Sequence, residues 1–289
     1  MELLQLIYFC DAAKTQNFSK TAEKFNVPPS NISQSVHRLE KELDTDLFDR
    51  SANRIRLNEK GKKFSERVEK SLNLLSEAKS IINDSEDKIS GEIKICICTN
   101  RRIVTQTIEK FRKLYPDVSF IINHDNSSGS EFDLLVGDEG ICESNLEKKL
   151  LIEESIILAV CKDNPIAKSE RITAENLKYQ RFITMPDKSS LSRHTNLICN
   201  SMNFIPDIAI RSDDPFYIRK YVDMGLGIAF VPSISWYGQF SDNTVFINIG
   251  DYKRSTYVYW DSKSYISKAV KMFLKELTEE VKNITKKTP

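Results

Sequence analysis

Two groups of polar and basic side chains near the N-terminus have the types and spacing needed to bind nucleic acid. The first group recurs in steps that place it along the outer side of a single helix. Amide side chains can pair bidentately with adenine, hydroxyls can donate or accept, and arginine can bind guanine or a phosphate. The first group is Ser30, Asn31, Ser33, Gln34, His37 and Arg38, and the second is Arg50, Arg54 and Arg56.

The surrounding residues predict three short helices, a hairpin and a long helix. Ser19 has the side chain of an N-cap for the second helix, and Pro28-Pro29 must end that helix before the third begins. Arg54 to Leu57 alternate basic and apolar residues, which fits a small β-wing, and Asn58 can cap a helix that continues to about Asp87. This order describes a winged helix-turn-helix; the alternative is a three-helix bundle with no role in nucleic-acid binding.

Beyond Ser90-Gly91 the pattern changes to strands alternating with helices, which predicts an α/β domain with a mainly parallel sheet. The expected helices are 103–114, 189–202, 216–224 and 267–284. The expected strands are 93–98, 118–123, 132–136, 156–161, 182–184, 207–210, 228–231 and 257–260.

The N-terminal pattern resembles that of the LysR-type transcriptional regulators over about sixty residues. The matching residues are Leu6, Phe9, Phe18-Ser19, Ala22, Phe25, Ser33, Leu39-Glu40, Leu43, Leu47-Phe48, Arg50, Leu57 and Gly61. Thinner matches follow at Tyr115-Pro116-Asp117-Val118, Asn164-Pro165-Ile166-Ala167 and Gly225 to Pro232. Pro29-Ser30, Asp44 and Asn58 depart from the family's usual Gln-Pro, Gly and Thr.

The resemblance implies a DNA-binding domain at 1–58, a linker and dimerisation helix at 59–89 and an effector-binding α/β domain at 90–289. This last domain would have two lobes, similar to periplasmic binding proteins and joined by crossing strands. The first lobe would span about 90–161 and 266–289, and the second about 162–265. Ser19 and the two groups above would contact DNA, the wing arginines through phosphates or the minor groove. For His37, a solvated side chain is an equal alternative.

In proteins of this family a small, often anionic ligand lies between the two lobes. Carried over by position, Thr99, Asn100 and Arg101 would bind it at the start of a helix, with Thr184 across the cleft. Arg102 would add positive charge there, although both arginines could simply be solvated. Only eight residues, His124 to Glu131, stand where the family has a further helix, so the pocket or the usual dimer contact could be altered.

Composition and motifs exclude several other classes of function. The net charge of +1 is uninformative, and no apolar run is long enough for a membrane helix. The chain opens without a secretory signal, so we expect a bacterial cytoplasmic protein. The six cysteines are scattered, and Cys96 and Cys98 are expected to be structural. The sequence contains no phosphate-binding loop, nucleophile elbow or zinc-protease motif, and it predicts no enzyme, metal or cofactor.

The expected partners are double-stranded promoter DNA, a small-molecule effector, a second copy of the chain and RNA polymerase. The resemblance implies a homodimer through the long helix that pairs again into a homotetramer. The apolar spacing of that helix resembles a dimerising coiled coil, although a helix packed on its own protein would show similar spacing. The alternative function is a ligand-independent regulator, or an architectural DNA-binding protein, whose α/β domain serves only oligomerisation.

Overall fold

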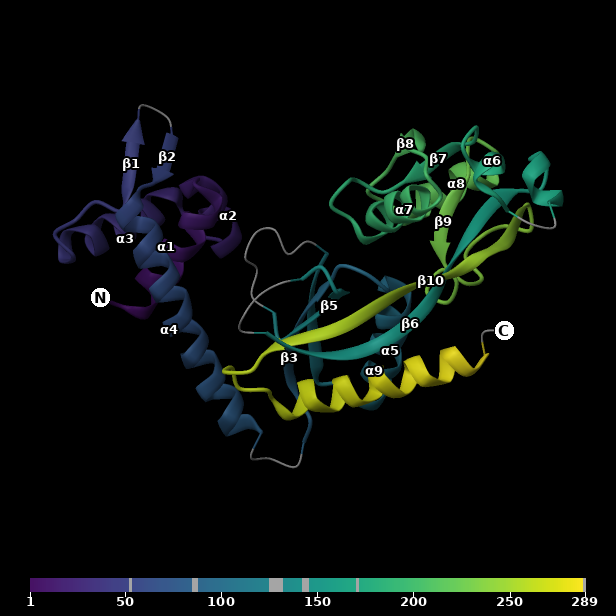
Figure 1. Ribbon diagram of the computed structural model, residues 1–289. Coiled ribbons are helices and arrows are strands. Elements are labelled where there is room, and N and C mark those ends of the chain that lie inside the picture. Colours follow the sequence, from purple (N-terminus) through teal and green to yellow (C-terminus); the bar gives the residue numbers. More distant parts are fainter. Residues whose placement is uncertain (52–53, 85–87, 125–131, 142–145, 170–171, 288–289) are drawn as a thin grey trace. The chain divides into compact units, whose positions relative to one another are not determined.

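The computed structural model describes residues 1–51, 54–84, 88–124, 132–141, 146–169 and 172–287. The chain forms two compact units, Met1–Ser85 and Glu86–Pro289 (Figure 1). Each unit has its own buried core, and each is described by itself below. Among the described residues, no helix is both long enough and apolar enough to cross a lipid bilayer.

The first unit is a winged helix-turn-helix followed by a long helix, as the sequence predicts. Three helices precede an antiparallel hairpin in which Phe48 pairs with Leu57 and Arg50 with Ile55. The elements are α1 (Leu3–Thr15), α2 (Phe18–Phe25), α3 (Pro29–Glu42), β1 (Phe48–Ser51), β2 (Arg54–Leu57) and α4 (Glu59–Asn83).

Side-chain caps set the starts of α2 and α4. Asn58 accepts a hydrogen bond from the backbone N–H of Gly61, which confirms its predicted role. The prediction of Ser19 as the cap of α2 is wrong. Asn17 has the extended backbone of a cap, and its side chain accepts from the N–H groups of Ser19 and Lys20. The helix therefore begins two residues earlier than predicted, with Phe18 as its first residue.

The core of the first unit is aromatic and includes the first half of α4. Phe9 contacts both Phe48 and Phe64 with ring centroids 5.7 and 5.3 Å apart. Val68 is buried in the same cluster, and Leu72 packs against it. The second half of α4 is different, because its large apolar side chains are half or more exposed. These side chains are Leu74, Leu75, Ile81 and Ile82.

The second unit is built on one large sheet with strand order β4-β3-β5-β10-β6-β9 and a separate pair, β7-β8. Its strands are β3 (Gly91–Ile97), β4 (Val118–Asn123), β5 (Leu134–Asp138), β6 (Leu146–Cys161), β7 (Arg181–Thr184), β8 (Asp207–Arg211), β9 (Ala229–Pro232) and β10 (Thr244–Asp261). Its helices are α5 (Arg101–Leu114), the 3₁₀ helix η1 (Pro165–Lys168), α6 (Ala174–Leu177), α7 (Ser190–Ser201), α8 (Pro215–Asp223) and α9 (Lys268–Lys287).

The predicted mainly parallel sheet is wrong for the centre of this unit. β3 pairs in parallel with β4 and β5, but β10 is antiparallel to both β5 and β6, and β6 is antiparallel to β9. The sequence predicts only the apolar ends of the two longest strands, whereas β6 has 16 residues and β10 has 18. Much of the remainder is exposed and polar, so it lacks the apolar run that indicates a buried strand.

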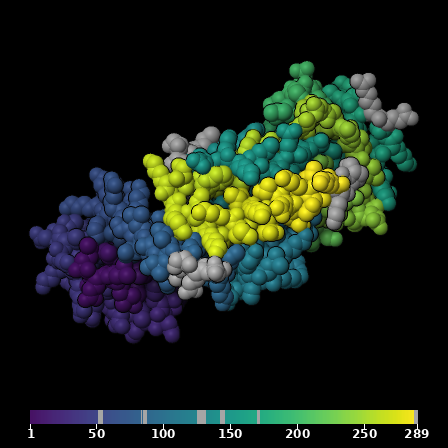
Figure 2. Space-filling model, turned by 90° about the horizontal axis from the view of Figure 1, so that it is seen from below, coloured from purple at the N-terminus to yellow at the C-terminus, as the bar shows by residue number. Residues whose placement is uncertain are grey.

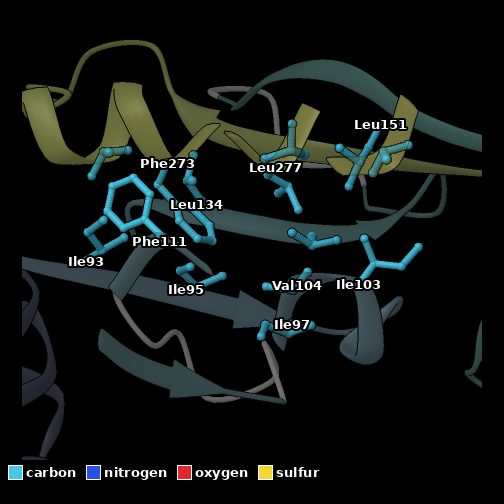
Figure 3. Packing of buried hydrophobic residues seen from close by; sticks show 14 of the residues in the cluster. Ile93, Ile95, Ile97, Ile103, Val104, Phe111, Leu134, Leu151, Phe273 and Leu277 are labelled. Atoms are coloured by element: carbon cyan, nitrogen blue, oxygen red, sulfur yellow. The ribbon is translucent and has the colours of Figure 1, made fainter. Parts of the chain in front are cut away.

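These two long strands join two lobes, which confirms the architecture that the family resemblance implies. The first lobe surrounds a core that includes Phe111, Leu134 and Phe273 (Figure 3). The second lobe surrounds a core that includes Phe182, Ile198 and Phe230. Along β6, Ile152 belongs to the first core and Ile156 to the second, so the chain passes between lobes within the strand.

Helix α9 returns the chain to the first lobe. Its apolar side packs on the same core as α5, where the Phe111 and Phe273 ring centroids are 5.3 Å apart. Its outer side lies along the surface of the second unit, drawn in yellow in Figure 2. The predicted helix at 267–284 is thus confirmed. Helix α5, which follows the first strand of this lobe, begins at the wall of a cavity.

Candidate functional site

Helix α3 separates its apolar and polar residues onto opposite sides. Ile32, Val36 and Leu39 are buried in the first unit. Of the side chains predicted to read DNA, Ser33 is half-buried, and the others are exposed: Ser30, Asn31, Gln34, His37 and Arg38. The structure therefore brings these six together on one accessible helix face, as direct reading of base edges requires. Ser19 is also exposed, in the first turn of α2.

The wing arginines differ in their surroundings. Arg56 is exposed on β2, whereas the side chain of Arg54 lies outside the described residues. Arg50 forms an ion pair with Glu40, a buried carboxylate on α3. Glu40 also accepts hydrogen bonds from the backbone N–H groups of Leu47 and Phe48, at 2.9 and 3.2 Å. Arg50 thus ties the wing to α3 in addition to any contact with phosphate.

Charge is also arranged at the start of α4, beside the wing. The Lys62 ammonium donates a hydrogen bond to Glu59 at 2.7 Å. This hydrogen bond lowers the pKa of the Glu59 carboxyl and raises that of Lys62. Both side chains are exposed, so the pair contributes little to stability.

The second unit contains a cavity of about 410 Å³ with a strongly cationic wall. Residues from both lobes line it, including those at the start of α5 and at the start of α7. Six cationic side chains lie on the wall, together with two acidic ones, Asp138 and Asp214. The cations are Arg101, Arg102, Lys188, Arg193, Arg219 and Arg254. Such a wall favours an anionic ligand.

Three of the four residues predicted to bind an effector line this cavity. They are Thr99, Asn100 and Arg101. Asn100 is 7% exposed, adopts a left-handed backbone with φ of 57°, and donates its amide N–H to Thr256 Oγ1 at 2.7 Å. Thr184 is not part of the wall. It is 1% exposed, and its hydroxyl faces Thr195 at 3.4 Å.

Four buried polar atoms belong to side chains on the wall and have no hydrogen-bond partner among the described residues. They are Thr99 Oγ1, Asn100 Oδ1, Ser190 Oγ and Arg254 Nε. A buried polar group without a partner costs about 1–3 kcal/mol, so native proteins rarely leave several at one place. Because all four side chains line one cavity, a polar ligand could satisfy them together.

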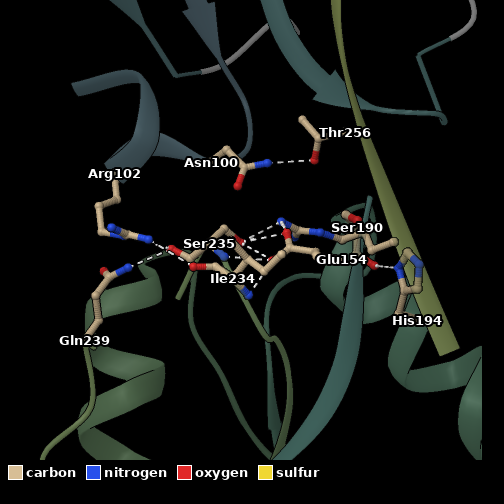
Figure 4. Close-up of polar contacts among 10 residues, drawn as sticks. Asn100, Arg102, Glu154, Ser190, His194, Ile234, Ser235, Gln239 and Thr256 are labelled. Atoms are coloured by element: carbon tan, nitrogen blue, oxygen red, sulfur yellow. Dashed lines mark hydrogen bonds and ion pairs between the residues drawn. The ribbon is translucent and has the colours of Figure 1, made fainter. Parts of the chain in front are cut away.

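A buried polar network supports the cavity at the point where the two lobes meet (Figure 4). Glu154 accepts from the backbone N–H groups of Ile234 and Ser235, at 2.9 and 2.7 Å, and from Arg254 at 2.8 Å. Arg102 donates to the carbonyl oxygens of Ile234 and Ser235, at 3.0 and 3.3 Å. The guanidinium of Arg102 is therefore held by backbone and is not simply solvated.

Sequence reasoning missed most of the other residues on the wall, among them Asp138 and Arg193. Asp138 ends β5 in the first lobe, Arg193 lies on α7 in the second, and the two form an ion pair. A carboxylate at the end of a parallel strand was an available signal for Asp138. Nothing local indicated Arg193, because its partner is 55 positions away in the sequence.

Aromatic and sulfur-containing side chains complete the wall. The Arg219 guanidinium lies over the Trp236 ring, 5.2 Å from its centroid. Burial lowers the pKa of Arg219, and the nearby Asp214 and Asp223 carboxylates oppose that shift. Cys98 also lines the cavity, and its sulfur is 3.8 Å from that of Cys96, too far for a disulfide bond.

Two parts of the chain considered from the sequence lie outside the described residues. They are Cys142 and most of 124–131, the segment that stands where the family has a further helix.

Two family profiles match the chain. The profile for bacterial regulatory helix-turn-helix proteins of the LysR family matches residues 3–62, and that for the LysR substrate binding domain matches residues 86–282. A relative from Bacillus subtilis, the transcriptional dual regulator GltC, is 28% identical over 242 residues, which cover 80% of this chain and 81% of GltC.

Solved structures share the fold over nearly the whole chain. Full-length OxyR C199D from Pseudomonas aeruginosa has a TM-score of 0.72 at 18% identity and covers 98% of this chain and 95% of its own. Full-length CbnR in complex with its target DNA has a TM-score of 0.67 at 17% identity and covers 98% and 100%. The profile matches extend over both units. The chain therefore belongs to the LysR family of bacterial helix-turn-helix transcriptional regulators, DNA-binding proteins that carry a substrate-binding domain.

Proposed function

We propose that the polar face of α3 enters the major groove of promoter DNA while the wing holds the phosphates. The observation that carries this proposal is the exposed row of Asn31, Gln34 and Arg38, opposite a fully buried apolar side. A helix with this division can dock into the groove without uncovering its core. CbnR, which shares this fold, was solved in complex with its target DNA, and this supports the proposal.

Operator binding by single variants tests this proposal. Replacing Gln34 or Arg38 by alanine should cost about 1–3 kcal/mol of binding free energy and relax the choice of sequence. Replacing Arg56 should weaken binding to all sequences alike and reduce the salt slope by about 1. Arg67 is an exposed arginine on α4, and its replacement by alanine is the matched control.

Fluorescence anisotropy on the chain's own upstream DNA gives the affinities, and footprinting locates the site. If Gln34→Ala and Arg38→Ala bind as tightly as the unaltered chain, the α3 face does not read DNA. Equal losses for Arg67→Ala and Arg56→Ala would show that general charge, and not the wing, carries the affinity.

The second part of the proposal is that a small polar or anionic ligand in the cavity modulates this binding. The cationic wall and its four unpartnered polar atoms support a ligand. Footprinting with and without metabolite pools tests it: a changed footprint is expected. An unchanged footprint with intact DNA binding would favour the alternative, a ligand-independent regulator whose second unit serves only oligomerisation.

We also propose a homodimer that assembles through α4, because its second half exposes four large apolar side chains. A further pairing into a tetramer, and contact with RNA polymerase at the promoter, complete the proposed action. All of these steps take place where the DNA is, in the bacterial cytoplasm, and none requires a catalytic step. Sedimentation of the full chain, with Leu75→Ser and Ile82→Ser as variants, tests the dimer.

A further inference from the structure

The start of α7 offers an anion-binding arrangement independent of α5. Ser190 and Arg193 are three residues apart, so they lie on one face of this twelve-residue helix, and both line the cavity. Ser190 is 7% exposed, and its hydroxyl has no partner among the described residues. The first backbone N–H groups of a helix favour negative charge at the same place.

The Arg193 guanidinium is presently shared between the two lobes. It donates to the Lys188 carbonyl at 2.8 Å within its own lobe, and it pairs with Asp138 of the first lobe. Gly140 allows this approach, because a Cβ there would lie 2.9 Å from the guanidinium and 3.1 Å from an Asp138 oxygen. The turn at Gly140 therefore packs closely against this ion pair.

We propose that Ser190 and Arg193 bind the carboxylate of the ligand, and that Asp138 occupies Arg193 until the ligand arrives. This inference rests on the proposed ligand role of the cavity and names its chemistry, a small organic carboxylate. Asp138 and Arg193 each keep one hydrogen bond after the ligand carboxylate has replaced Asp138 at the guanidinium. Asp138 still accepts from the Gly140 N–H at 3.0 Å, and Arg193 still donates to Lys188.

The exchange transfers no atom and only replaces one carboxylate by another at the same guanidinium. When the ligand binds, the ion pair that joins β5 of the first lobe to α7 of the second is lost. The ligand then forms its own contacts with α7 and with the start of α5. Asp138 therefore acts as an internal competitor, and removing its charge should strengthen the binding of a carboxylate.

Calorimetric titration of the full-length chain with succinate, and with its uncharged diamide succinamide, tests this inference. Asp138→Asn should bind succinate about tenfold more tightly than the unaltered chain, with no gain for succinamide. Arg193→Gln added to Asp138→Asn should abolish the gain, and Ser190→Ala should reduce it. Asp214→Asn is the matched control, because it removes the same charge from the wall without touching the Arg193 pair.

The inference fails if Asp138→Asn binds succinate no more tightly, if Asp214→Asn gives an equal gain, or if no variant binds succinate. Hydrogen exchange without ligand is a second measurement: Asp138→Asn and Arg193→Gln should each speed exchange at the start of α7 and the end of β5, and the double variant no further. Unchanged exchange in both would also overturn it. Footprinting with metabolite pools on the same samples tests the proposed function separately, since an effector response can persist when succinate does not bind.

Discussion

Glu154 and Arg254 face each other directly across the β6–β10 ladder, with their side chains 0% and 5% exposed and 2.8 Å apart. The carboxylate has three further donors, from Ile234 and Ser235, so its charge is well compensated. One position away along the same two strands, Glu153 and Lys253 form a pair at 3.5 Å with both side chains half exposed. The two neighbouring pairs allow a controlled comparison.

We predict that Glu154→Gln destabilises the second unit by about 3 kcal/mol, because Arg254 is left buried without its counter-charge. Glu153→Gln should change the free energy of unfolding by no more than about 0.5 kcal/mol, since its pair is solvated. Urea unfolding followed by fluorescence measures both. Similar losses of unfolding free energy in the two variants would show that burial of the pair does not determine its contribution.

Glu40 is the corresponding buried carboxylate of the first unit. Glu40→Gln removes the charge that pairs with Arg50 and weakens the hydrogen bonds to the backbone of Leu47 and Phe48, so we expect a loss of about 2 kcal/mol. Glu42, two residues on, forms an ion pair with the exposed N-terminal ammonium and provides the control. A thermal melt in which Glu42→Gln is the more damaging change would refute this account of the wing.

Asp44 occupies a position where glycine should be better. Its φ is +47°, a left-handed conformation in which an L side chain is strained and glycine is not. Asp44→Gly should therefore raise the stability of the first unit by about 0.5–1 kcal/mol, after allowing for the greater freedom of glycine when unfolded. Asp46→Gly, where φ is not positive, should lower it. Chemical denaturation of the two variants measures whether each change raises or lowers the free energy of unfolding.

Burial raises the pKa of the Cys199 thiol from an ordinary 9.0 to about 12. Its neutral form favours the folded state, so this contribution to stability is complete below pH 9 and is lost as the pH rises toward 12. At pH 9.5 the native chain should leave Cys199 unalkylated by iodoacetamide, because the thiolate is the reactive form. Mass spectrometry of the same reaction in urea should show it modified; rapid modification in the native chain would show that the thiol is accessible.

The first unit could be predicted closely from the sequence because its signals are local. The spacing of Ile32, Val36 and Leu39 fixes the buried side of α3, and Asn58 identifies the start of α4. The cap of α2 was misplaced by two residues, since Asn17 and Ser19 both have capping side chains and only the backbone distinguishes them.

The second unit could be predicted less completely because its decisive contacts are distant in sequence. The two lobes came from family resemblance, whereas the antiparallel centre of the sheet depends on pairs such as Glu154 with Arg254, a hundred residues apart. In the cavity, Asn100 and Arg101 follow from their place at a helix start. Asp138 and Arg193 become a pair only when the two lobes are folded together, which no local pattern contains.

The division of α4 into a buried half and an exposed half sets the smallest fragment that can fold around the helix-turn-helix. Truncation after residue 58 would remove Phe64 and Val68 and uncover Phe9 and Phe48 to water. A fragment that ends near residue 73 keeps Phe64 and Val68 packed on the core and omits the exposed apolar side chains of the second half of α4. Expression of such a minimal domain would thus separate autonomous folding from self-association, two properties that one continuous helix combines in the intact chain.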